Sequence, residues 1–179
     1  MKVGVLALQG SVSEHRLAMD QLDVENVEVR EPIDMEGIEG MIMPGGESTT
    51  LRKLLVNSGL WKTIANSDIP IMATCAGAIL IGKSNDETFE KMDFEIDRNY
   101  YGRQKDSFER DIRIKNGKVF KGIFIRAPAI LSLGSETEAI AWDEEMVVGC
   151  KMDKNMALTF HPELTDDLRF HKMWLEGVK

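Results

Sequence analysis

The chain has 179 residues, of which 43% are hydrophobic and 29% charged, and its formal net charge is −8. This length and composition fit one globular domain, which we expect to span residues 1–179. The acidic balance argues against nucleic acid or an anionic membrane surface as the main partner. No apolar run approaches the roughly 20 residues that a membrane-spanning helix needs.

Cysteine usage and the N-terminus bear on the compartment. Cys75 and Cys150 are the two cysteines of the chain, and their wide spacing makes neither a disulfide framework nor a metal-ligand pair. Residues 1–10 lack the long apolar region of a signal peptide and fit a buried strand better. We therefore expect the protein in the reducing cytoplasm.

The first half of the chain alternates between strand-like and helix-like segments. Strands are predicted at 2–8, 24–31, 40–44 and 69–74, and helices at 13–22, 48–57 and from residue 76 to 82. Near-continuous apolar strands that alternate with helices are typical of a parallel sheet covered by helices on both faces.

The second half has a different pattern. Residues 110–133 alternate strictly and contain Asn116-Gly117, a strong hairpin signal. Further strands are predicted at 137–142, 146–152 and 155–160, followed by a last helix with Thr165 as N-cap. The fold class is thus α/β, with a mainly parallel central sheet and an antiparallel extension. Such sheets place ligands beyond the carboxyl ends of their strands.

The segment "MIMPGGESTT" ends one predicted strand at Pro44. Gly45 and Gly46 can adopt backbone angles closed to other residues. Their amides precede a helix N-terminus and could face an anion or a carbonyl oxygen. Taken alone, however, a Gly-Gly pair at such a junction is most often only a turn.

The segment "IMATCAG" ends another strand at Cys75. A sharp turn from strand to helix would expose the sulfur, as in a nucleophile elbow, and the helix dipole would favour thiolate. Ala76 and Gly77 would leave room for the turn, and the Ala76 amide could donate to an oxyanion. The alternative is a buried structural thiol, because free cysteine is among the most buried residue types.

The segment "LTFHPELTDD" carries a third set of polar residues. Pro162 holds His161 in an extended conformation, so that Glu163 shares its face at about 6.6 Å along the chain. A carboxylate there can orient one imidazole nitrogen and leave the other free as an acid or base. The alternative is an ordinary strand-end histidine beside a solvated glutamate.

The three segments support one another. A nucleophile, a base with its carboxylate and an oxyanion pocket are the parts that acyl transfer requires. All three are predicted at the same edge of the sheet. No cluster has zinc-ligand spacing, and no glycine loop matches a dinucleotide or P-loop fingerprint, so we expect neither a metal nor a cofactor.

A cysteine elbow followed by His-Pro-Glu resembles the class I, or triad, glutamine amidotransferases, a flavodoxin-like fold. Within that class the chain is most similar to the glutaminase subunits of pyridoxal 5'-phosphate synthases. Sister amidotransferases share the triad but lack several of the motifs that carry this resemblance. These motifs, in the family's order, are "LALQGSVSEH" (6–15), "PGGESTT" (44–50), "TCAG" (74–77), "RNYYGRQKDSFE" (98–109), "FIRAP" (124–128) and "FHPELT" (160–165).

The resemblance implies hydrolysis of L-glutamine to L-glutamate and ammonia. Cys75 would attack the side-chain amide and form a thioester, His161 would move protons, and Glu163 would orient His161. The backbone amides of Gly46 and Ala76 would form the oxyanion hole. The family pattern assigns glutamine binding to Gly45, Gly46, Glu47, Arg103, Ile125 and Arg126. A guanidinium such as that of Arg103 binds a carboxylate through two hydrogen bonds.

The resemblance also implies a partner. Ammonia would pass to a synthase subunit that makes pyridoxal 5'-phosphate from a pentose phosphate and a triose phosphate, within a large hetero-oligomer. Gln9, Gly10 and His15 are expected on the docking surface, although a helix histidine with satisfied hydrogen bonds is an equal alternative for His15. Ala73 and Ala78 stand where other members often carry Gly and Leu.

Two other functions remain open. One is the glutaminase of imidazole glycerol phosphate synthase, which belongs to the same class. The other is a non-catalytic redox or binding protein with a cysteine elbow. Cys150 is interpreted as a buried strand residue, and His171 as a surface or packing residue.

Overall fold

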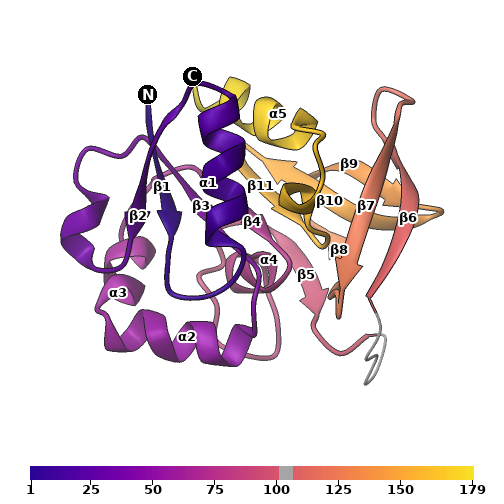
Figure 1. Ribbon diagram of the computed structural model, residues 1–179. Coiled ribbons are helices and arrows are strands. Elements are labelled where there is room, and N and C mark those ends of the chain that lie inside the picture. The colour runs from indigo at the N-terminus through magenta and orange to yellow at the C-terminus, as the bar shows by residue number, and fades with distance from the viewer. Residues whose placement is uncertain (101–106) are drawn as a thin grey trace.

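The computed structural model describes residues 1–100 and 107–179, which form one large mixed sheet with helices against it, together with a small two-stranded sheet (Figure 1). The strands of the described residues are β1 (Lys2–Leu6), β2 (Glu25–Val29), β3 (Gly40–Met43), β4 (Ile71–Thr74), β5 (Phe94–Asp97), β6 (Ser107–Ile114), β7 (Val119–Ile125), β8 (Ala129–Leu133), β9 (Glu138–Asp143), β10 (Met146–Met152) and β11 (Asn155–Leu158). The helices are α1 (Val12–Gln21), α2 (Ser48–Asn57), α3 (Leu60–Ala65), α4 (Ala76–Ile81) and α5 (Arg169–Val178), with short 3₁₀ turns η1 (Pro32–Met35) and η2 (Pro162–Leu164).

The large sheet changes from parallel to antiparallel pairing at β11. Its strand order is β2-β1-β3-β4-β11-β10-β9-β6-β7. The pairs from β2 to β11 are parallel, and the pairs from β11 to β7 are antiparallel. The predicted fold class, a mainly parallel α/β sheet with an antiparallel extension in the second half, is confirmed.

Alternation along the parallel strands divides the core into two layers. On β3, Ile42 packs on one face, whereas Met41 and Met43 pack on the other. The first face is covered by α1 and α5 and the second by α2, α3 and α4 (Figure 1). Side chains of successive strand residues point to opposite faces, so strands buried on both sides need the continuous apolar runs seen in the sequence.

Two features differ from the prediction. The segment after β7 leaves the large sheet, and β8 pairs with β5 in the small sheet. The last helix begins at Arg169, so the prediction of Thr165 as its N-cap is wrong. The Thr165 hydroxyl donates to Pro162 O at 2.9 Å and closes η2, whereas Asp167 accepts from Arg169 N at 3.1 Å. The chain therefore turns once before the helix starts.

The carboxyl ends of three neighbouring parallel strands bring distant segments together. The register pairs Thr74 at the end of β4 with Leu158 at the end of β11, and Met43 on β3 with Ala73. The residues that follow these ends are the three segments identified from the sequence. Their common edge is the place where a parallel sheet binds ligands.

Candidate active site

Cys75 lies in a strained turn between β4 and α4. Its backbone has φ 48° and ψ −110°, a combination uncommon for any residue with a side chain. The Cys75 amide donates to Leu158 O at 2.8 Å, which fixes the turn to the end of β11. The thiol is only 5% exposed and its sulfur lies 3.7 Å from Ile125 O. This is the geometry of a nucleophile elbow.

The turn is tight because small residues follow Cys75. A Cβ on Gly77 would lie 2.2 Å from Met43 O on the neighbouring strand, so a side chain does not fit there. Ala76 is the first residue of α4 and is buried. Its amide has no acceptor within the helix, because the first four amides of a helix lack one. Such an amide is available to a developing oxyanion.

His161 and Glu163 form a buried hydrogen-bonded pair. His161 Nδ1 lies 2.7 Å from Glu163 Oε1, and the two residues are 5% and 7% exposed. Burial opposes the charge of the imidazolium, but hydrogen bonds to Cys75 and Glu163 outweigh it and raise the pKa of His161 to about 10. Burial likewise opposes the carboxylate, but His15 and His161 lower the pKa of Glu163 to about 2. The pair therefore favours a charged imidazole next to the thiol.

The glycine loop after β3 packs against both reacting side chains. A Cβ on Gly45 would lie 2.7 Å from His161 Cε1 and 3.0 Å from Cys75 Cβ. Gly46 has φ 142°, which disfavours any other residue. Gln9 fixes this loop, because its Oε1 accepts a hydrogen bond from Glu47 N at 2.8 Å. These contacts bring Gly45 to Cys75 and His161 and set Gly46 against Gln9.

The Glu47 side chain has a structural task that the sequence analysis did not assign. It caps α2 by accepting from Thr49 N at 3.1 Å and from Thr50 N at 2.8 Å. It also forms an ion pair with Arg98, whose Nη2 lies 3.1 Å from Glu47 Oε1. Burial opposes the carboxylate, but the hydrogen bonds from Thr50 and Thr49 lower the pKa of Glu47 to about 2. A contact between Glu47 and glutamine would thus involve its backbone more readily than its carboxylate.

The remaining predicted substrate residues fall into two groups. Ile125 ends β7 beside Cys75, and Arg126 follows it with an exposed side chain and φ 46°. Arg103 lies outside the described residues. The structure therefore brings Ile125 to the sulfur and leaves the Arg126 side chain exposed beside it.

Comparison with known proteins agrees with this geometry. Residues 5–179 match the model of the SNO glutamine amidotransferase family. The chain belongs to this family. The resemblance to class I glutamine amidotransferases is confirmed.

Individual relatives and solved structures match along nearly the whole chain. The pyridoxal 5'-phosphate synthase subunit PdxT of Methanocaldococcus jannaschii is 46% identical, over 99% of this chain and 98% of that protein. The protein of the same name from Thermotoga neapolitana is 45% identical, with complete coverage of both. A crystal structure titled as a glutamine amidotransferase superposes with a TM-score of 0.91 at 37% identity, covering 98% of each chain.

One histidine of this family member lies elsewhere than expected. His15 is fully buried, so its prediction as a docking-surface residue is wrong, and its contacts with His171 and Thr74 fit the alternative of a satisfied helix histidine. Its ring contacts Thr74, Glu163 and His171, and His171 is also fully buried. The sequence did contain a signal. His15 follows Val12 by three residues and precedes Met19 by four, which places it on the apolar face of α1.

The other expected docking residues lie at the glycine loop. Gln9 is half-buried and holds Glu47 N, whereas Gly10 is exposed with φ 92°. A Cβ on Gly10 would meet Gly45 O at 1.9 Å. Both residues contact the glycine loop. A docking role for them stays a prediction.

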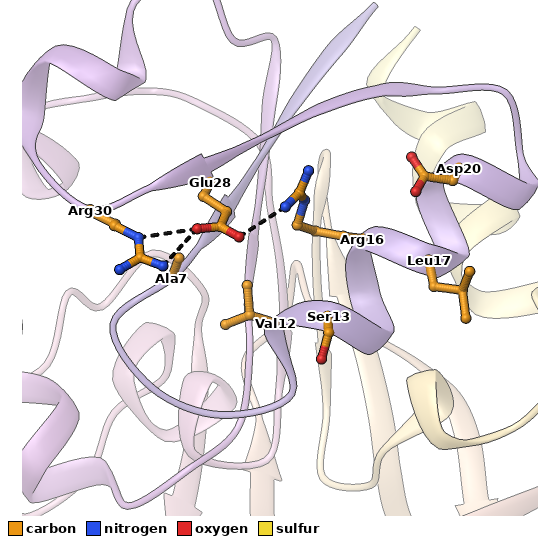
Figure 2. A pocket seen from close by; sticks show the side chains of 8 residues that line it. All are labelled: Ala7, Val12, Ser13, Arg16, Leu17, Asp20, Glu28 and Arg30. Carbon is orange, nitrogen blue, oxygen red and sulfur yellow. Dashed lines mark hydrogen bonds and ion pairs between the residues drawn. The ribbon is translucent and has the colours of Figure 1, made fainter.

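A separate pocket of about 460 Å³ lies between α1 and β2 (Figure 2). Figure 2 shows Glu28 between Arg16 and Arg30, to which it is paired at 2.8 and 2.7 Å. The pocket is lined by Ala7, Val12, Ser13, Arg16, Leu17, Asp20, Glu28 and Arg30. This lining contains neither cysteine nor histidine, so the triad and not the pocket is the candidate active site.

Among residues 1–100 and 107–179, no helix combines the length and the apolar character that a membrane span needs. No group of three or more His, Cys, Asp or Glu side chains in these ranges is arranged to hold a metal ion.

Proposed function

We propose that this chain is the glutaminase subunit of a pyridoxal 5'-phosphate synthase. It hydrolyses L-glutamine to L-glutamate and ammonia, and passes the ammonia to a synthase subunit that makes pyridoxal 5'-phosphate from a pentose phosphate and a triose phosphate. The observation that carries the activity is the strained Cys75 turn beside the buried His161–Glu163 pair. The full-length relatives named PdxT support the partner.

In the proposed reaction, His161 takes the thiol proton as the Cys75 sulfur attacks the side-chain amide carbon of glutamine. The negative oxygen of the tetrahedral intermediate accepts from the backbone amides of Gly46 and Ala76. His161 donates a proton to the departing nitrogen, ammonia leaves, and a thioester remains. Water then attacks the thioester while His161 accepts its proton, which releases glutamate and restores the thiol. Glu163 holds the imidazole in place throughout.

Glutamine would bind above the sulfur, against the loop of Gly45, Gly46 and Glu47. Ile125 and Arg126 would line the opposite side, and Arg103 would pair with the substrate α-carboxylate. The complex is proposed to be a large hetero-oligomer in the cytoplasm, and no cofactor is assigned to this subunit.

The test is glutaminase activity measured with and without the cognate synthase. Ammonia release should rise when the synthase is added, and pyridoxal 5'-phosphate should form once the sugar phosphates are present. Cys75→Ala should abolish both. Ammonia release without pyridoxal 5'-phosphate formation would point to another synthase partner, such as that of imidazole glycerol phosphate synthase. The relatives do not favour that alternative.

His161→Asn distinguishes the enzyme from a redox or binding protein. An oxidisable Cys75 that works alone would not need His161, whereas the proposed reaction needs its proton transfers. We expect no measurable ammonia release from His161→Asn in the presence of the synthase. Near-normal turnover in this variant would rule out the triad.

A further inference from the structure

Two buried histidines extend the chain of contacts from the triad beyond Glu163. His15 Nε2, from α1, lies 3.4 Å from Glu163 Oε2, and His15 Nδ1 lies 3.0 Å from His171 Nε2, from α5. Both imidazoles are fully buried, and their ring planes meet at 62°. From the sulfur toward the interior, the side chains in contact are therefore, in order, Cys75, His161, Glu163, His15 and His171.

The second oxygen of Glu163 explains why this arrangement matters. Oε1 is held by His161 at 2.7 Å, but Oε2 has no hydrogen-bond partner among the described residues and is buried. A buried carboxylate oxygen without a donor is costly. His15 Nε2 faces this oxygen at 3.4 Å, slightly beyond the usual hydrogen-bond length. A small rotation of either side chain would complete the bond.

The contacts also select the tautomers. If His171 donates through Nε2–H, His15 Nδ1 is the acceptor and the His15 proton is on Nε2, directed at Glu163 and at Thr74 Oγ1, 3.3 Å away. The opposite choice would point a lone pair of His15 at the carboxylate. It would also leave a buried N–H at His171 Nδ1, which has no partner among the described residues. An unpaired buried acceptor costs less than an unpaired donor. We therefore assign the first arrangement.

The burial of both rings keeps them neutral. Burial lowers the pKa of His15, against the opposing effect of Glu163, and burial together with His15 lowers the pKa of His171 to about 3. A neutral N–H orients a carboxylate without cancelling its charge. A lysine or arginine in the same place would compete with His161 for that charge.

We propose that His15, supported by His171, is a positioning residue for the glutaminase reaction, and that it holds the Glu163 carboxylate so that Oε1 stays on His161. This proposal rests on the proposed function. His15 touches neither the sulfur nor the expected place of glutamine, so it acts through Glu163.

The test compares two substitutions of His15 in the complex with the synthase. His15→Leu removes the donor, and His15→Gln keeps an N–H near the position of Nε2. We expect His15→Leu to lower kcat about tenfold, the rate equivalent of one hydrogen bond to a charged group, with little change in KM for glutamine. His15→Gln should recover most of this loss.

The pH profile separates positioning from packing. The charged and titratable groups around His15 are Glu163, His161, His171 and Glu14. Without His15, Glu163 takes up a proton more readily, so the acidic limb of kcat/KM should move to higher pH in His15→Leu and return in His15→Gln. Met19→Ala, which removes a buried side chain from the same helix, is the matched control. It should lower thermal stability and leave the acidic limb unchanged.

A second measurement needs no glutamine. Iodoacetamide alkylates a sulfur that has lost its proton, and His161, which shares a hydrogen bond with Cys75, is the base beside this sulfur. Alkylation of Cys75 at neutral pH should therefore be slower in His15→Leu than in Met19→Ala. If the native complex released no ammonia, the proposed function would fail, while this comparison would still decide the role of His15.

Two results would overturn the proposal. One is an acidic limb and an alkylation rate in His15→Leu that match Met19→Ala. The other is His15→Gln as slow as His15→Leu, both with native thermal stability. Should His15→Leu not fold, His171→Leu takes its place. It should give a smaller loss of kcat, about threefold, with the same shift of the acidic limb, and an unchanged profile would contradict the proposal.

Discussion

Gly45 is the residue at which the loop, the thiol and the imidazole come closest. Neighbouring atoms leave no room for a side chain at this position, because a Cβ would meet His161 Cε1 at 2.7 Å and Cys75 Cβ at 3.0 Å. An added methyl group must push the imidazole or the thiol out of place. Misplacement of reacting groups by about 1 Å costs on the order of 100-fold in rate.

We therefore expect Gly45→Ala to lower kcat at least tenfold while the chain still folds and binds the synthase. Steady-state ammonia release and thermal unfolding measure the two effects. Gly177→Ala is the control, because a Cβ there meets nothing within 4 Å. In α5 it should stabilise the chain by up to about 1 kcal/mol and leave kcat unchanged. Equal activity in both variants would contradict the close packing at Gly45.

The two cysteines should differ sharply in reactivity. Cys150 is fully buried on β10, and burial raises the pKa of its thiol to about 12. Cys75 is 5% exposed and shares a hydrogen bond with His161. Iodoacetamide should therefore label the native protein once, at Cys75, as read by peptide mass spectrometry. Cys75→Ala should remove the label, and labelling of native Cys150 would contradict this expectation.

The start of α2 is the element on which the glycine loop depends. The Glu47 carboxylate accepts from two backbone amides of the first turn and from the Thr50 hydroxyl at 2.7 Å. An N-cap of this kind contributes about 1 kcal/mol. It also joins the glycine loop to the first turn of the helix.

Glu47→Ala should therefore lower the free energy of unfolding by about 1 kcal/mol, as measured by urea denaturation. Glu36→Ala, at an exposed glutamate between η1 and β3, should change it by less than about 0.5 kcal/mol. A loss of stability no larger than that of Glu36→Ala would mean that the cap does not stabilise α2.

Elements marked by apolar periodicity were predictable from the sequence, and those decided by distant contacts were not. The bounds of α2 and β10 agree with the prediction, because apolar periodicity and turn residues mark both ends. Neither β5 nor its pairing with β8 was predicted, since a short strand in a second sheet has little pattern of its own. Thr165 has the residue type of an N-cap but closes η2 instead.

The site shows the same division. Cys75, His161 and the glycine pair could be located because each follows an apolar strand. His15 was expected on the docking surface and His171 was assigned to no site, since their meeting depends on how α1 and α5 pack on one face of the sheet. That packing joins residues 156 positions apart, which no local pattern reports.

At the scale of the whole molecule, four buried ionisable side chains, those of His15, His161, Glu163 and His171, set a pH dependence of stability. His15 and His171 have pKa values lowered from 6.5 in the folded state, so unfolding takes up protons as the pH falls below about 6.5. The contribution of Glu163 is present above 4.5 and is lost toward 2. That of His161 is complete below 6.5 and is lost as the pH rises through about 10. Stability should therefore be greatest near pH 6.5.

Between pH 6.5 and 4.5 the two neutral histidines dominate this balance. The free energy of unfolding should fall with pH by up to about 1.4 kcal/mol per pH unit for each of them. In His171→Leu the free energy of unfolding should depend less steeply on pH, by up to about 1.4 kcal/mol per pH unit. Urea denaturation at several pH values measures this dependence. Gly177→Ala should keep the native slope. An unchanged slope in His171→Leu would mean that His171 is charged in the folded chain.

The place of β11 in the sheet has a consequence for synthesis of the protein. The Cys75 turn is held by Leu158 O, and His161 follows directly after β11. A chain leaving the ribosome therefore presents its cysteine long before the strand that holds it and the base that would activate it. Nascent or prematurely terminated chains that end before β11 cannot consume glutamine. The order of the elements thus delays the proposed activity until the protein is nearly complete.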